Sequence, residues 1–166
     1  MYNYKWDSFP ARLHTTKEII YFLENIDNIQ NIVNSTSVDL IDIIFGDICN
    51  PCLLNETTKF INKYGNMDRN KDIQKLVLEI SSRKIFYYGN IPTNYYYTNY
   101  YINNRKKIDL KSKYQLTEYI ISDEEIYTDL DYISKLAKTI FSNNIQIHII
   151  PHLNLKCVKT KEYIFE

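Results

Sequence analysis

The sequence predicts an α/β fold with three layers, α/β/α, around a small and mostly parallel sheet that carries an irregular tyrosine-rich insertion. Short apolar runs rich in isoleucine alternate along the chain with segments of helical spacing. The order strand, helix, strand, loop, helix, strand is typical of parallel sheets, whose right-handed crossovers place helices on both faces. At 166 residues the chain is expected to form a single α/β domain, residues 1–166, with a core that needs no disulfide.

Two helices are predicted from apolar spacing and capping residues. The first begins at Thr15 or Thr16, either of which can cap it, carries Glu18 in its first turn and is expected to end near Ile32. The second begins in the acidic segment 122–125 and has one apolar stripe, formed by Ile126, Leu130, Ile133, Leu136, Ala137 and Ile140. A shorter helix is expected over residues 55–64.

Three apolar runs have the length of strands: residues 38–45, 75–80 and 145–150. For residues 75–80 the periodicity also allows the end of a helix that begins near Asp72. Residues 81–114 show no clear pattern, and so long a segment in a small domain is usually an ordered functional loop or a flexible insertion. We place the tyrosine-rich insertion at about residues 86–114.

Charge and composition narrow the classes of function. Twenty Lys and Arg residues balance twenty Asp and Glu residues, so no net field attracts nucleic acid or an anionic membrane surface. No apolar stretch approaches the ~20 residues of a membrane span and the first residues lack a signal segment, so a cytoplasmic protein is expected. No cofactor is predicted, and the oligomeric state stays open. Sixteen tyrosines and three glycines indicate an AT-rich coding sequence, which weakens tyrosine clusters as evidence for function.

The predicted sheet places reactive side chains at one edge. In parallel sheets ligands bind outside the carboxyl ends of the strands. The residues that follow the three predicted strands include Asp47, then Ser81, Ser82 and Arg83, and finally His152. These five are our candidate catalytic residues, and a small-molecule or glycan ligand is their expected partner. His152 would act as the base because imidazole titrates near neutrality, and Arg83 would pair with an anion or polarise a carbonyl.

Cys49 and Cys52 support two alternative sites. A Cys-x-x-Cys motif between a strand and a helix is the thioredoxin-like arrangement, in which the helix N-terminus activates the first thiol. Pro92, in an Ile-Pro-Thr segment, matches the cis-proline that such proteins place beside the disulfide. The other alternative is a zinc site, for which Cys49, Cys52, His152 and Cys157 would supply a Cys3His ligand set.

His14 begins a His-x-Thr motif that ends at Thr16. Two-histidine phosphoesterases use this form but need a second copy, which neither His148 nor His152 provides. We therefore interpret Thr15 or Thr16 as the helix cap, with His14 beside it.

Three segments, "IIFGDI", "KLVLEISSRK" and "IQIHIIPHLN", resemble the SGNH-type hydrolase-like proteins, including their GSCFA-like branch and relatives in large DNA viruses. The resemblance implies a parallel sheet between helices, a serine nucleophile in a Gly-Asp-Ser motif, a late Asp-x-x-His base and action on acyl esters of glycans or lipids. Here Ile48 stands in the serine position and Ile149 in the aspartate position. These departures imply a shortened or degenerate member of that family.

The combined interpretation is an SGNH-hydrolase-like, esterase-type domain, active or degenerate, that binds or cleaves an acyl-ester or glycan ligand at the carboxyl edge of the sheet. The first alternative is a thiol-disulfide oxidoreductase that uses Cys49 and Cys52. A further alternative is a non-enzymatic interaction module whose working surface is the tyrosine-rich insertion. Within that insertion, residues 94–107 place tyrosines next to three cations, the ingredients of a single-strand nucleic-acid surface.

Overall fold

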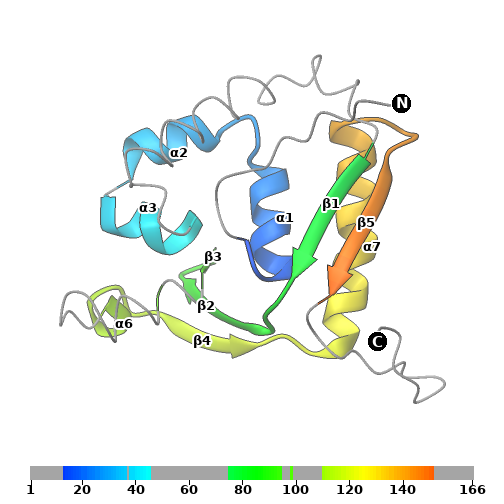
Figure 1. Cartoon of the computed structure of the whole chain (residues 1–166). Coiled ribbons are helices and arrows are strands. Elements are labelled where there is room, and N and C mark those ends of the chain that lie inside the picture. The colour runs from blue at the N-terminus through cyan, green and yellow to red at the C-terminus, as the bar shows by residue number, and fades with distance from the viewer. Residues whose placement is uncertain (1–12, 37, 46–74, 95–97, 99–109, 152–166) are drawn as a thin grey trace.

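The computed structural model describes residues 13–36, 38–45, 75–94, 98 and 110–151. Helices and strands are mixed along this part of the chain, as the α/β prediction requires (Figure 1). The predicted helix at residues 55–64 lies outside the described residues. In chain order the elements are α1 (Thr16–Glu24), α2 (Ile29–Ser35), α3 (Val38–Phe45), β1 (Lys75–Ile80), β2 (Lys84–Tyr88), β3 (Ile91–Thr93), α6 (Leu110–Lys113), β4 (Thr117–Ile120), α7 (Asp123–Ile140) and β5 (Gln146–Pro151).

The described strands form two sheets. β1 and β5 pair in parallel, with Ile80 opposite Pro151, so their carboxyl ends are level. This pair confirms both the strand prediction for residues 75–80 and the parallel arrangement of these two strands. β2 pairs antiparallel with β3 on one side and with β4 on the other. The antiparallel sheet was not predicted.

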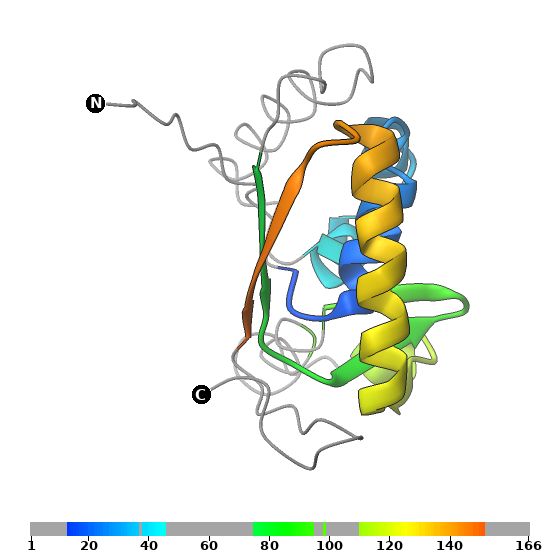
Figure 2. The same cartoon turned by 90° about the vertical axis from the view of Figure 1, so that its right-hand side faces the viewer.

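The described helices lie on one face of the β1–β5 pair, as the side view shows (Figure 2). Leu78 of β1 and Ile149 of β5 are half-buried and pack against the main core, whereas Val77 and Ile150 are exposed. This alternation is what a strand pair with one covered face requires. A second helical layer is not among the described residues, so the three-layer arrangement stays a prediction.

The core is centred on α7, which begins where the sequence predicts and carries the predicted apolar stripe. Ile126, Ile133, Ala137 and Ile140 are buried on one side of the helix. All but Ile126 join the main core with the buried residues of α1. Burying such side chains contributes roughly 1.5–3 kcal/mol each for the larger ones, so this stripe is the main reason the helix docks.

Ser122 caps α7 through a capping box. Its hydroxyl accepts from the Glu125 N–H at 3.2 Å, and the Glu125 carboxylate accepts from the Ser122 N–H at 2.9 Å. Replacing a capping serine by alanine leaves a helix N–H without its partner. We expect Ser122→Ala to lower the free energy of unfolding by about 1 kcal/mol in urea titrations. Thr139→Ala, on the exposed side of the same helix, is the control; equal stability of the two variants would contradict the prediction.

The predicted first helix is two helices. α1 begins as expected at a Thr15 cap, but it ends at Glu24. There the side-chain amide of Asn25 donates to the Tyr21 carbonyl at 2.8 Å, and a turn leads into α2. Asparagine side chains compete with the helix for main-chain partners, which favours a break at this position.

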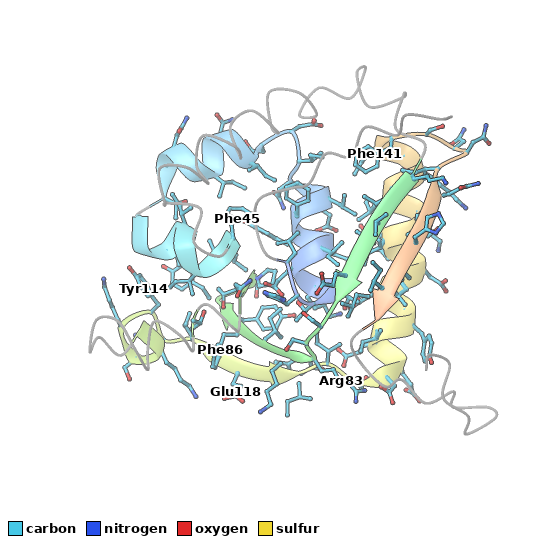
Figure 3. The ribbon with its side chains drawn as sticks, in the orientation of Figure 1. Phe45, Arg83, Phe86, Tyr114, Glu118 and Phe141 are labelled. Carbon is cyan, nitrogen blue, oxygen red and sulfur yellow. The ribbon has the colours of Figure 1, made fainter. Side chains whose placement is uncertain are left out.

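Residues 38–45 form the helix α3, so the strand predicted there is wrong. Ile41 and Ile44 pack in the main core, while Ile43 packs in a second cluster with Phe86. The ring of Phe45 extends toward α1, 6.4 Å from the ring of Tyr21 between centroids (Figure 3). Asp39 and Asp42 interrupt this run three positions apart. The buried residues Ile41, Ile44 and Phe45 follow helical spacing, so the strand prediction missed a helical signal.

Residues 81–94 are more regular than predicted. β2 and β3 form a hairpin in which Tyr88 pairs with Ile91. Gly89 occupies the first turn position at φ 57°, a conformation that glycine adopts without the steric cost of a Cβ. The Gly-Asn pair between two apolar runs is the hairpin signal that our interpretation missed. Most of the tyrosine-rich insertion, residues 95–97 and 99–109, lies outside the described residues.

No helix within the described ranges combines the length and the apolar character that crossing a membrane requires.

Candidate functional site

Ser81, the first residue after β1, contacts an imidazole. Its Oγ lies 2.7 Å from Nδ1 of His14, across 67 positions of sequence. His14 stands immediately before Thr15, the cap of α1. The carboxyl end of β1 and the N-terminal end of α1 meet at this point (Figure 1). The contact therefore joins a strand end to a helix start, the place where α/β folds usually bind ligands.

Main-chain hydrogen bonds fix His14 against the end of β1. Its carbonyl oxygen accepts from the N–H groups of Ser81 and Ser82, each at 3.0 Å. Its own N–H donates to Oε2 of Glu18 at 3.2 Å. Because both main-chain groups are held, the imidazole starts from a fixed Cα position beside Ser81.

Glu18, which accepts the hydrogen bond from the His14 N–H, is a buried residue with only 2% of its surface exposed. Its Oε2 also accepts from the Thr15 N–H at 2.8 Å and from the Thr15 hydroxyl at 2.7 Å. Burial raises the pKa of Glu18 from 4.5 to about 8. Hydrogen bonds from Thr15, from the His14 N–H and from the Asn94 side chain oppose this rise because they favour the charged form.

The side chain of Asn94 bonds to Glu18, and both Asn94 and its partner Thr98 are buried. The Asn94 N–H donates to the Ile43 carbonyl at 2.6 Å, and its carbonyl accepts from the Thr98 hydroxyl at 2.6 Å. These bonds tie α3 to the end of β3. The Glu18 environment is therefore assembled from α1, α3 and the residues after β3.

Asp129 of α7 forms a second buried polar contact with α1. Its Oδ2 accepts from the Thr16 hydroxyl at 2.5 Å, and its Oδ1 accepts from Nζ of Lys17 at 2.8 Å. Thr16 is 1% exposed and Asp129 is 5% exposed. This contact fixes the start of α1, and with it His14, relative to α7.

The His14–Ser81 pair can do acid–base chemistry. A neutral imidazole that carries its hydrogen on Nε2 presents a lone pair on Nδ1 to the Ser81 hydroxyl. That tautomer can remove the hydroxyl proton as the oxygen attacks an electrophile. The N–H groups of Ser81 and Ser82 are already bonded to the His14 carbonyl, so they do not point at a substrate oxyanion.

The structure does not bring the predicted catalytic residues that it describes into one site. Ser81 is in the pair just described, but the Ser82 hydroxyl makes a local turn with Lys84, accepting from its N–H at 3.0 Å and donating to its carbonyl at 3.1 Å. Arg83 forms an ion pair with Asp123 at the start of α7, near the β1–β2 junction in Figure 3. Asp47 and His152 lie outside the described residues.

The α3 helix removes the argument that placed Asp47, Cys49 and Cys52 at the sheet edge, because the element before them is not a strand. The redox interpretation also expected a cis-proline at Pro92. Pro92 lies in β3, and no peptide bond in the described segments is cis, so the expected cis-proline is wrong.

The zinc ligand set lies wholly outside the described residues: Cys49, Cys52, His152 and Cys157. Within the described ranges, no group of three or more His, Cys, Asp or Glu side chains is arranged to hold a metal ion.

Sequence reasoning placed His14 beside a helix cap but did not bring it to Ser81. The signal was available in two separate predictions. Ser81 was expected at a strand's carboxyl end, and the cap of the first helix was expected at Thr15 or Thr16. Since carboxyl strand ends and helix N-termini share one edge of an α/β sheet, the two positions could have been paired.

Comparisons of the chain with protein-family models, with curated proteins and with solved structures give no match.

Proposed function

We propose that this domain is an esterase-type hydrolase in which Ser81 is the nucleophile and His14 the base. The observation that carries the proposal is the 2.7 Å contact between Ser81 Oγ and His14 Nδ1. A hydroxyl within hydrogen-bond reach of a base is the arrangement that nucleophilic catalysis needs. The proposal keeps the SGNH-like class expected from the sequence but assigns the base to His14 rather than to His152.

The reaction would follow the acyl-enzyme route. Ser81 Oγ attacks the ester carbonyl carbon while Nδ1 of His14 takes the hydroxyl proton. The C–O bond to the leaving alcohol breaks, and His14 returns the proton to that alcohol. Water then attacks the acyl group on Ser81, and His14 takes one proton from the water and returns it to Ser81 as the acid departs.

We expect slow turnover because two main-chain N–H groups near the nucleophile are already occupied. The Ser81 and Ser82 N–H groups donate to the His14 carbonyl and so cannot stabilise an oxyanion. Loss of a single oxyanion donor costs roughly 10²–10³ in kcat in other hydrolases. A small activated acyl ester, with a good leaving group, suits such a site better than an amide. A glycan-borne acyl ester is the natural substrate class that the sequence resemblance implies.

A fluorophosphonate probe tests the proposal because it labels activated serine hydroxyls. Wild-type protein should be labelled, Ser81→Ala should lose the label, and Ser82→Ala should keep it. His14→Gln should slow labelling by roughly 10²–10⁴, the usual contribution of a general base. An unlabelled wild-type protein, or equal labelling of Ser81→Ala, would contradict the proposal.

A further inference from the structure

Glu18 differs from an ordinary capping residue in its surroundings. A capping box needs only the exchange of hydrogen bonds between the cap and the third helical residue. The other capping box described in this structure, Ser122 with Glu125, is exposed. Glu18, by contrast, is 2% exposed, and its carboxyl group also accepts from the N–H of His14, the residue before the cap. The buried carboxyl group is therefore hydrogen-bonded directly to the main chain of the candidate base, which lies four positions before it in the sequence.

We propose that Glu18 is a positioning residue for the His14–Ser81 pair. Its carboxyl group fixes the main chain of His14, and a change in the charge of that group alters the environment of the imidazole. The base it acts on is the one assigned in the proposed function. The hydrogen bond between Glu18 and the His14 N–H can be tested without any enzymatic activity.

Geometry supports the positioning role. The His14 N–H is held by Glu18, and the His14 carbonyl is held by the N–H groups that follow β1. Loss of the Glu18 contact would free one of the two anchors, and the imidazole would move relative to Ser81 Oγ. Since the pair depends on a 2.7 Å separation, a small shift of the main chain is enough to break it.

The charge environment lets Glu18 act as the titrating group. Lys17 on α1 and Asp129 on α7 form an ion pair at 2.8 Å. The first turn of α7 also carries Asp123, which pairs with Arg83, together with Glu124 and the capping carboxylate of Glu125. Ser81 after β1 and Asn94 after β3 carry no charge. Because burial raises the pKa of Glu18 to about 8, the carboxyl group changes its charge within the range where most proteins stay folded.

Glutamine at position 18 separates the two roles of the residue. A glutamine oxygen can accept the same N–H and hydroxyl bonds, and glutamine also forms capping boxes. Glu18→Gln therefore keeps the helix start and the anchor on His14 but cannot ionise. Glu18→Ala removes the anchor as well.

The test is a pH titration of ¹⁵N-labelled histidine side chains by NMR, from pH 5 to 10. The His14 signals are assigned by their loss in His14→Gln. In wild-type protein the His14 ring nitrogens should show an additional step with a midpoint near pH 8. Glu18→Gln should lack that step, and Ser81→Ala should retain it. In Glu18→Ala the Nδ1 signal at neutral pH should resemble that of Ser81→Ala, because the pair is broken.

Two outcomes would overturn the inference: a wild-type His14 titration without the additional step, or a step that persists in Glu18→Gln. Fluorophosphonate labelling over the same pH range separates this result from the proposed function. A step in the NMR titration without labelling supports Glu18 as the positioning residue and rejects the hydrolase. Labelling without the step supports the hydrolase and rejects the role of Glu18.

Discussion

Replacing Glu18 by glutamine is expected to stabilise the fold by an amount that grows as the pH rises from about 5 to 8. The folded carboxyl group keeps its proton up to about pH 8, whereas the unfolded group releases it near 4.5. Between these values the folded state binds one more proton than the unfolded state. The stability of the wild-type protein must therefore fall as the pH rises.

The magnitude follows from the same linkage. Each pH unit between the two pKa values costs roughly 1.4 kcal/mol, so the wild-type protein loses on the order of 3–5 kcal/mol by pH 8. Glutamine has nearly the same shape and does not ionise, so its stability should not follow this slope. The two proteins should differ by less than about 1 kcal/mol near pH 4.5, where both side chains are neutral.

Urea titrations of both proteins at each pH unit from 5 to 9 would measure the effect, with the free energy of unfolding taken by linear extrapolation. Glu124→Gln is the matched control, because Glu124 is exposed in the first turn of α7. It should show no gain that grows with pH. A Glu18→Gln difference that stays constant across this range would contradict a raised pKa in the folded state.

Elements with local signals could be predicted from the sequence. Thr15 with Glu18, and Ser122 with Glu125, each carry the capping pair that sets a helix start, and the structure has both capping boxes. The strand pair β1 and β5 was predicted because its apolar runs are short and bounded by turn residues. In these cases the information lies within a few residues of the element it determines.

Elements whose conformation depends on distant partners could not be predicted. The apolar run at residues 38–45 is helical because Ile43 packs with Phe86 while Ile41 packs with the main core. Phe86 is far from Ile43 in the sequence, so this contact leaves no local signal. A short apolar-rich run is compatible with a strand or a buried helix, and here only the spacing of Asp39 and Asp42 favours the helix that tertiary packing selects.

The candidate site was predicted in part for the same reason. Ser81 was expected at the edge because it follows a recognisable strand. His14 became its partner only through the way α1 enters the fold, which depends on Asp129 of α7 and on the main chain after β1. Residues at the end of one predicted element can be placed from sequence, but their partners come from another element.

Asp129→Ala is expected to destabilise the protein by about 1–4 kcal/mol through lost contacts at the interface of α1 and α7. The variant would leave the buried Thr16 hydroxyl without its acceptor, and such a group costs about 1–3 kcal/mol. Lys17 would lose its ion pair as well, but its side chain is 25% exposed, so water can replace the carboxylate and the added cost is below about 1 kcal/mol.

Urea unfolding compares Asp129→Ala with Asp131→Ala, an exposed position on the same helix that should change stability by less than about 0.5 kcal/mol. Asp129→Asn is an informative intermediate, since its amide can donate to the Thr16 oxygen and its carbonyl can accept from Lys17. This variant should lose less stability than the alanine variant.

In a double-mutant cycle with Thr16→Val, removal of both partners should cost less than the sum of the single changes, because the valine leaves no unpaired hydroxyl. Additive losses would mean that Asp129 stabilises α1 through Lys17 and packing rather than through the Thr16 hydroxyl. Coupling of about 1–2 kcal/mol would instead identify this hydrogen bond as the link that holds the start of α1, and therefore His14, against the rest of the fold.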